Sequence, residues 1–271
     1  MKKIIYLITS SFFLFSLQSG CSQEDSIKTF TFINNTDNVK VLYEGFIHSG
    51  DTIKHGMYKS FYPDGSLKSE GKFVNDNPIE YHKEWYDNGQ LKSKLFYLGN
   101  LHYMGYHYYK NGHLMREANY NNGAYYGLFK EYYPNEKIYR YSCFDFGQKG
   151  VYSMEFDSLG RILLDEGVVF SPEFRTNYPL DSIKLDSIFD LRITVAEPPS
   201  TKTIIVIEET LEDGKIIESQ EYPIQGYTVF YKKKFESAGK HTLLIKGKIV
   251  DTSNGQLRKE NVSIVDLNII E

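Results

Sequence analysis

The sequence predicts an all-β protein, in which a long antiparallel β-meander of hairpin repeats is followed by a small β-sandwich. The first observation is an aromatic phrase that recurs about every 24 residues and places a turn at Gly65, Gly89, Gly112, Glu136 and Gly160. The second is that runs with strand-like alternation flank these turns. The third is a break in the pattern at residues 171–173, and from about Arg192 onward aromatic residues thin out and β-branched residues take over. An internal period of this length is typical of stacked arrays, in which each unit buries a face against its neighbours.

The chain begins with the pattern of an export signal. Lys2 and Lys3 precede an apolar run over residues 4–17, and small residues follow that run. The run is shorter than the roughly 20 residues that a membrane-spanning helix needs. We therefore expect residues 1–20 to be a signal peptide and residues 21–38 to form a polar tether that ends in a first strand.

The end of this segment, Ser19-Gly20-Cys21, resembles the lipoprotein signals of bacteria, in which the cysteine is lipidated and becomes the first mature residue. The resemblance implies a lipid anchor on Cys21, with plain secretion and a retained anchor as the alternatives. The acidic residues Glu24 and Asp25 resemble the tags of Bacteroidetes lipoproteins that reach the cell surface. We therefore expect an outer-membrane lipoprotein of the cell envelope, and the side of that membrane stays open.

Charge and cysteine content argue against several classes of partner. Removal of Lys2 and Lys3 with the signal peptide reduces the 31 basic residues to 29, against 35 acidic residues. A chain with this balance lacks the concentrated Lys and Arg that binding to nucleic acid or anionic lipid requires. Cys143 would be the one thiol of the mature chain, so no internal disulfide is expected. The equivalent positions of other repeats are not cysteine, and we interpret Cys143 as a residue that only fills a repeat position.

Each repeat is predicted to be one β-hairpin. The first strands are expected at residues 56–62, 80–86, 103–109, 127–133 and 150–156. The second strands are expected at residues 67–73, 91–97, 114–120, 138–144 and 162–168. The segments between them contain Gly and Asn, which tolerate the positive φ of a tight turn, and this assigns a structural role to Gly65, Gly89, Gly112 and Gly160. Leu67 and Phe73 begin and end one second strand, six residues apart, and are expected on the same face.

The first strands carry two adjacent aromatic columns, which a regular strand places on opposite faces of the sheet. The candidate binding face consists of Phe61, Trp85, Tyr108 and Tyr132, and the other column consists of Tyr62, Tyr86, Tyr109, Tyr133 and Phe156. Exposed rows of Tyr and Trp anchor protein partners or stack on sugars. The alternative is structural, because cross-strand aromatic pairs also stabilise a single-layer sheet.

Two stretches carry a family resemblance. Residues 56–71 read GMYKSFYPDGSLKSEG and residues 127–135 read GLFKEYYPN, and both resemble MORN repeats of the second bacterial type. That group is often labelled a YwqK-like antitoxin component. The resemblance covers residues 43–170 and implies an elongated antiparallel meander, which we place at residues 39–170. Individual units depart from the pattern, since Glu80 and Tyr103 replace the glycine that opens the first strand and Glu136 replaces a turn glycine.

After the repeats, β-branched runs separated by turn clusters predict a second domain at residues 171–271. The runs lie at residues 191–195, 203–207, 216–221, 228–235, 241–250 and 262–270. Their spacing is typical of a small β-sandwich. Residues 235–243, FESAGKHTL, resemble the late strands of immunoglobulin-like or PKD-like domains of exported bacterial proteins, which implies an immunoglobulin-like β-sandwich.

The histidines do not form a predicted metal site. His102, His107 and His113 lie close in the sequence. However, His102 and His107 are five residues apart and point to opposite faces of a regular strand. None of the histidines shows the spacing of a known ligand motif. We therefore predict no metal and no cofactor.

A search for catalytic groups also gives a negative prediction. Glu84, His107 and Glu131 share one repeat column, but a flat sheet offers no cleft around them. We interpret them as solvated positions balanced by Lys83 and Lys130. The sequence contains no nucleophile elbow, phosphate loop or dinucleotide turn. The prediction is that the protein is not an enzyme.

The sequence thus predicts a non-enzymatic cell-envelope lipoprotein that acts as a protein-binding or scaffolding repeat module and does not bind nucleic acid. One alternative is a glycan-binding surface lipoprotein that uses the aromatic face. Another is an antitoxin-like partner-binding protein, as the family label implies, although an export signal argues against a cytoplasmic toxin as its partner. A hydrolase is the last alternative. The identity of the partner and the oligomeric state stay open.

Overall fold

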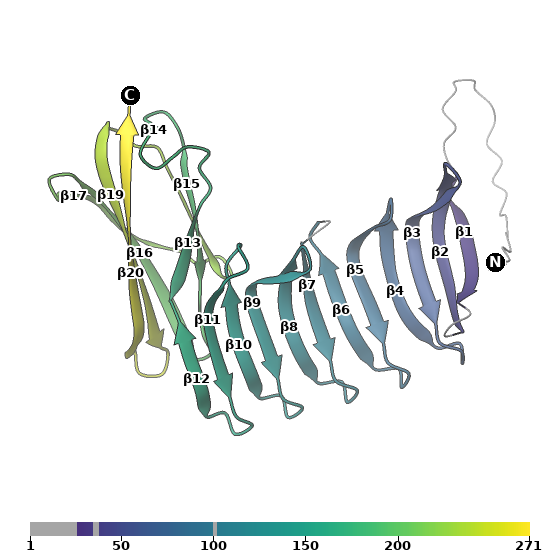
Figure 1. The fold of residues 1–271 in the computed structure, drawn as a ribbon. Coiled ribbons are helices and arrows are strands. Elements are labelled where there is room, and N and C mark those ends of the chain that lie inside the picture. Colours follow the sequence, from purple (N-terminus) through teal and green to yellow (C-terminus); the bar gives the residue numbers. More distant parts are fainter. Residues whose placement is uncertain (1–25, 35–37, 100–101) are drawn as a thin grey trace, which may run out of the picture. The chain divides into compact units, whose positions relative to one another are not determined.

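The computed structural model describes residues 26–34, 38–99 and 102–271, and its regular elements are twenty β-strands (Figure 1). Within these residues there is no helix with the length and apolar character to cross a membrane. The predicted signal peptide and Cys21 lie outside the described residues. Contact density divides the chain after Gly123 into a first unit and a second unit, and the two are described separately.

Strands β1–β12 follow one another in a 12-stranded sheet, so the predicted antiparallel meander of hairpin repeats is confirmed. The strands of the first unit are β1 (Lys28–Asn34), β2 (Val39–His48), β3 (Asp51–Phe61), β4 (Leu67–Val74), β5 (Asn77–Trp85), β6 (Leu91–Tyr97), β7 (His102–Tyr108) and β8 (Leu114–Asn121). Figure 1 shows them side by side in the order of the sequence. Strand β2 adds a strand that the sequence prediction did not name.

In the turns within the hairpin repeats of the first unit, two residue types have different roles. Gly65, Gly89 and Gly112 adopt φ values of 89°, 79° and 89°, which L residues reach only with strain. The residue before each glycine accepts a hydrogen bond instead, as when the Asn88 carboxamide oxygen accepts from the Gln90 amide at 3.1 Å. Asn was expected to share the positive φ, and this detail was wrong, because its side chain closes the turn while its backbone stays at negative φ.

A β-bulge follows the turn within each of the hairpins β3–β4, β5–β6 and β7–β8, and it decides which side chains share a face. Ser60 lies opposite Ser69, but the next residue, Phe61, lies opposite Leu67, so Lys68 is an extra residue. The same shift occurs between β5 and β6 and between β7 and β8. The expectation that Leu67 and Phe73 share a face was therefore wrong, because one inserted residue reverses the alternation between them.

The second unit begins with the last four strands of the meander: β9 (Ala124–Tyr132), β10 (Ile138–Phe144), β11 (Gly150–Phe156) and β12 (Ile162–Gly167). A three-stranded sheet follows, made of β13 (Phe170–Phe174), β15 (Phe189–Val195) and β18 (Thr228–Lys233). A five-stranded sheet has the order β14 (Ile183–Lys184), β20 (Leu257–Ile270), β19 (Gly239–Asp251), β16 (Thr201–Leu211) and β17 (Ile216–Tyr222).

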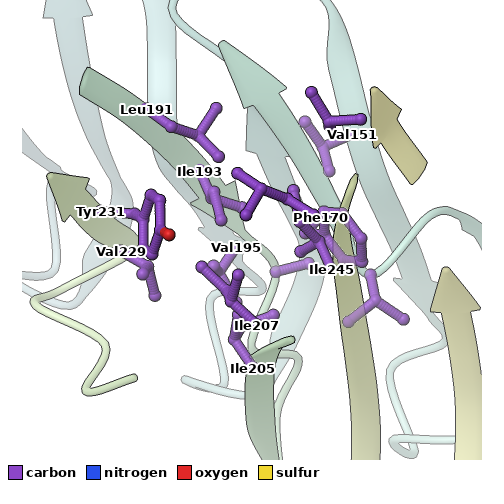
Figure 2. Packing of buried hydrophobic residues seen from close by; sticks show 14 of the residues in the cluster. Val151, Phe170, Leu191, Ile193, Val195, Ile205, Ile207, Val229, Tyr231 and Ile245 are labelled. Atoms are coloured by element: carbon purple, nitrogen blue, oxygen red, sulfur yellow. The ribbon is translucent and has the colours of Figure 1, made fainter. Parts of the chain in front are cut away.

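These two sheets bury a common core. Alternate residues of their strands are inaccessible to solvent, for example Leu191 and Ile193 on β15, Ile205 on β16 and Ile245 on β19. Figure 2 shows these side chains converging in one cluster. Strict alternation of this kind is what two packed sheets require of their inner faces. The arrangement is that of a β-sandwich, and its immunoglobulin-like character stays a prediction.

The last hairpins of the meander pack into the same core. Tyr141, Cys143 and Met154 are 1%, 0% and 0% exposed and belong to the same buried cluster as the sandwich residues. The Tyr141 hydroxyl accepts a hydrogen bond from the Glu197 amide at 2.8 Å. The Cys143 thiol contacts the Val195 carbonyl oxygen at 3.5 Å. Burial raises the pKa of the Cys143 thiol to about 12, so the group is unreactive as a nucleophile near neutral pH.

A buried charged cluster links the two sheets of the sandwich. Glu209 on β16 and His241 on β19 are both 2% exposed, and the carboxylate lies 2.7 Å from Nδ1 of the imidazole. Lys233 on β18, in the other sheet, donates to both Glu209 and Glu218. A buried carboxylate needs such partners because desolvation of an unpaired charge is costly. The sequence analysis did not identify this cluster.

Candidate binding face

The strand register of the first unit sorts its side chains onto two faces. One face carries a continuous row of rings, which we call the ladder face: Tyr58, Phe73, His82, Tyr97, Tyr103 and Tyr120. Successive ring centroids in this row lie 5.7, 4.7, 5.2, 5.3 and 4.6 Å apart. Each such pair contributes roughly 0.5–1.5 kcal/mol beyond the area it buries. The row therefore stabilises a sheet that has no second layer within the first unit.

The second aromatic column predicted from the sequence makes hydrogen bonds between hairpins. The Tyr62 hydroxyl donates to the Trp85 carbonyl oxygen at 2.7 Å, and the Tyr86 hydroxyl donates to the Tyr108 carbonyl oxygen at 2.7 Å. In the second unit the Tyr133 hydroxyl donates to the Phe156 carbonyl oxygen at 2.9 Å. This column is structural, because its polar ends are used within the sheet.

His82 takes the place of an aromatic ring in the ladder. Its ring lies between Phe73 and Tyr97, and Nε2 is 3.3 Å from the Lys72 carbonyl oxygen. Burial lowers the pKa of His82, because the charged form would lose hydration among the neighbouring rings. The close approach requires Gly71 below it, since a Cβ there would lie 2.3 Å from the imidazole.

The opposite face, which we call the lysine face, carries the candidate residues Phe61, Trp85 and Tyr108. Each lies directly opposite the leucine that begins the next strand, in the pairs Phe61–Leu67, Trp85–Leu91 and Tyr108–Leu114. All six side chains are half-buried. Alternating first strands are two strand spacings apart, about 9.6 Å, so the three aromatic residues form a regular row.

A second row on the lysine face is more exposed. Tyr81 lies opposite Phe96, which lies opposite Met104. Tyr81 is 40% exposed and Phe96 is 43% exposed, and Met57 on β3 is also exposed on this face. Among the described strands β3–β8, the exposed large apolar side chains all belong to this face.

Lysines lie between these two apolar rows. Lys83 pairs with Glu70 at 3.4 Å and its ammonium group lies 4.5 Å from the centre of the Tyr81 ring. In the part of the chain that the structure describes, Lys59 and Lys94 make no ion pair. The face thus combines apolar side chains with three lysines, whose charge Glu70 offsets in part because it lies opposite Lys59 and pairs with Lys83, although the whole chain is acidic.

Tyr132, the fourth candidate residue, belongs to the second unit. It is half-buried on β9 and lies opposite Ile138 of β10. Gly160, the last predicted turn residue, is also in this unit and has a φ of 91°. Cys21, the predicted lipidation site, lies outside the described residues.

The two glutamates of the polar repeat column make separate ion pairs. Glu84 is exposed and pairs with Lys92 at 3.1 Å, and Glu131 of the second unit pairs with Arg140 at 3.7 Å. Lys83 was expected to balance Glu84, but it lies on the opposite face, and the bulge residue Lys92 takes that role. Burial lowers the pKa of His107, with Arg116 adding to the effect. Across residues 26–34, 38–99 and 102–271, no three His, Cys, Asp or Glu side chains gather closely enough to hold a metal ion.

The comparisons with known proteins agree with this geometry. A search of curated proteins finds no match to the chain. The family model described as a MORN repeat variant matches residues 54–75, 81–98, 105–122 and 125–145. Three of these segments lie in the first unit and the last in the second. Repeats of this type suggest a module for binding a protein or a membrane. The chain therefore carries four consecutive repeats of the MORN variant type.

Proposed function

We propose that the protein is a non-enzymatic binding module of the cell envelope, which docks a protein partner on its lysine face. The observation that carries the proposal is the one-sided distribution of exposed apolar side chains in the first unit. Met57, Tyr81 and Phe96 gather on the lysine face. Exposed apolar patches of this kind mark interaction sites, and Tyr, Phe and Met are enriched in interface cores.

The ladder face is a weaker candidate. Its rings are already used in contacts with one another, and its tyrosine hydroxyls are used in hydrogen bonds between hairpins. On the lysine face, Lys59 and Lys94 favour a partner with acidic residues at the rim of its interface, because complementary charge speeds encounter and fixes orientation. The proposed partner is therefore an acidic protein surface with an apolar centre.

Crosslinking in intact cells followed by affinity capture tests this function. We expect a partner to be captured by the unaltered chain and lost with Phe96→Ser. The matched control is Ile216→Ser, because Ile216 is 56% exposed and lies on β17 in the second unit, outside the lysine face. If both variants capture the partner equally well, the partner binds a surface other than the lysine face.

The envelope location rests on the sequence of the N-terminus. We propose that a lipid on Cys21 anchors the protein to the outer membrane, as the Ser-Gly-Cys ending implies. The variant Cys21→Ala is expected to move the protein from the membrane fraction to the soluble fraction. Unchanged membrane retention would contradict the lipid anchor and leave the lysine face to be tested separately.

A glycan-binding role is the second candidate. The row formed by Phe61, Trp85 and Tyr108 offers flat rings at regular spacing along one face, and such rings stack on sugars. A glycan array with the purified protein tests it. Binding that disappears with Trp85→Ala and persists with Tyr86→Phe, which removes only the hydroxyl that bonds to the Tyr108 carbonyl oxygen, would favour this role over protein docking.

A further inference from the structure

The first strand of the sheet has an unguarded edge. Strand β1 pairs with β2 over seven residues, and within the described residues no strand pairs with its other side. An edge strand presents unpaired backbone amide and carbonyl groups, which are a template for another strand. Proteins usually block such edges with charged residues, proline, bulges or covering side chains.

Two other edges of the molecule carry these protections. On β12, Asp165 pairs with Arg258 at 3.1 Å, and Lys259 donates to the Gly167 carbonyl oxygen at 3.2 Å, so side chains of β20 cover this edge. On β17, Glu218 and Glu221 place negative charge along the edge. A second strand is discouraged at both edges.

Among the described residues, strand β1 has only Lys28 of these protections. Its sequence, KTFTFIN, contains one charged residue, Lys28, and neither Pro nor Gly. Thr, Phe and Ile are strong strand formers, and a segment with this composition and low charge has the signature of strands that pair between chains. Ile33 is 56% exposed at the end of the strand, and its pairing with β2 is regular throughout, without a bulge.

We propose that β1 pairs antiparallel with β1 of a second copy of this chain and so forms a two-fold dimer with a continuous sheet. An antiparallel edge is self-complementary, because a two-fold axis brings the same backbone groups together. With the two-fold axis at Thr31, Phe30 of each copy lies opposite Phe32 of the other copy, which gives two identical aromatic pairs. Lys28 then lies opposite Asn34, so no like charges meet, and the cross-strand aromatic pairs stabilise the interface.

This inference is independent of the proposed function. The β1 edge and the lysine-face residues Tyr81 and Phe96 lie on different strands, with β2, β3 and β4 between them. A dimer would present two lysine faces and would raise the apparent affinity for a partner that has two binding sites. Loss of the dimer leaves each lysine face intact.

Sedimentation equilibrium of the full chain in detergent tests the proposal. We expect twice the protomer mass for the unaltered chain and a dimer that is at least about 10-fold weaker with Thr31→Lys, because two like charges would meet on the axis. The matched control is Thr52→Lys on β3, a similarly half-buried threonine that lies opposite Ile47 of β2 and away from the β1 edge. It should leave the dimer unchanged.

A second variant keeps the test independent of folding. Thr31→Cys is expected to give a covalent dimer on mild oxidation in membranes, whereas Thr52→Cys is not. A monomer at every concentration overturns the proposal. So does a dimer that Thr31→Lys leaves as strong as before, because another surface would then hold it. The circular dichroism spectrum of Thr31→Lys must match that of the unaltered chain. If Thr52→Lys also abolishes the dimer, the β1 edge does not hold the dimer together.

Discussion

The two units use the same hairpin repeat but hold it together in different ways. In the first unit the hairpins form a single layer, and rows of half-buried rings and hydroxyls connect them. In the second unit Tyr141, Cys143 and Met154, at most 1% exposed, enter the core of the β-sandwich. The comparison shows that a repeat sequence specifies strands and turns, whereas its stability depends on what its face is packed against.

The largest predicted effect tests burial in the second unit. Met154→Ala is expected to cost about 4 kcal/mol, because it removes a fully buried side chain and leaves a cavity. Leu95→Ala in the first unit should cost clearly less, because Leu95 is only half-buried. Urea denaturation of both variants measures the difference. Equal losses would contradict the distinction between the units.

The second prediction concerns the charged cluster in the sandwich. Lys233→Met is expected to cost about 3 kcal/mol, because Glu209 would stay buried with a missing cationic partner. Lys240→Met serves as the control, since Lys240 pairs with Glu212 in full solvent exposure and should change the unfolding midpoint little. If the two variants unfold alike, the cluster does not join the sheets.

The third prediction separates the units by pH. The pKa values of His82 and His107, both in the first unit, are lowered by burial. Their stabilising contribution is complete above the unfolded pKa of about 6.5 and is lost as the pH falls through the lower folded-state value. The hydrogen-exchange protection factors, which correct for the slower intrinsic exchange at acid pH, should therefore fall on acidification in strands β4–β8. His82→Phe, which keeps a ring in the ladder, should reduce this fall, and no reduction would remove His82 as its cause.

The smallest predicted effect compares a turn of the second unit with the equivalent turn of the first unit. Glu136 has a φ of 66° at the turn position where Gly112 occupies the equivalent place in the preceding repeat. Glu136→Gly is expected to stabilise the protein by about 0.5–1 kcal/mol, because glycine removes the steric cost of positive φ. Gly112→Ala should destabilise by a similar amount. Thermal unfolding of the two variants checks the opposite signs.

The local structure of the repeats could be predicted from the sequence. The expected second strand at residues 138–144 matches β10 (Ile138–Phe144), and the phrase that ends in Gly89 marks a turn. These signals are local, because turn chemistry and alternation act within a few residues. Strand β13 was missed because Ser171-Pro172-Glu173 has the composition of a break. Proline is tolerated there because β13 is an edge strand.

Features that depend on distant residues could not be predicted. A bulge at Lys68 reverses the alternation of β4, and no residue type marks it. The burial of Cys143 depends on Val195, which lies 52 residues away. The lysine face illustrates the same limit, because the negative charge of the whole chain gives no sign of a face on which Lys59, Lys83 and Lys94 lie between two apolar rows.

The hydrogen bond from a tyrosine hydroxyl to the next hairpin limits how the length of such an array can change in evolution. The bonded residues are 23 positions apart for Tyr62 and Trp85, 22 for Tyr86 and Tyr108, and 23 for Tyr133 and Phe156. The separations differ by one residue, so the hydrogen bond accepts repeats that differ in length by one residue. Duplication or loss of a complete hairpin would join the same donor to an equivalent carbonyl. The length of the array can therefore vary in whole repeats, while this hydrogen bond keeps the length of each repeat within a narrow range.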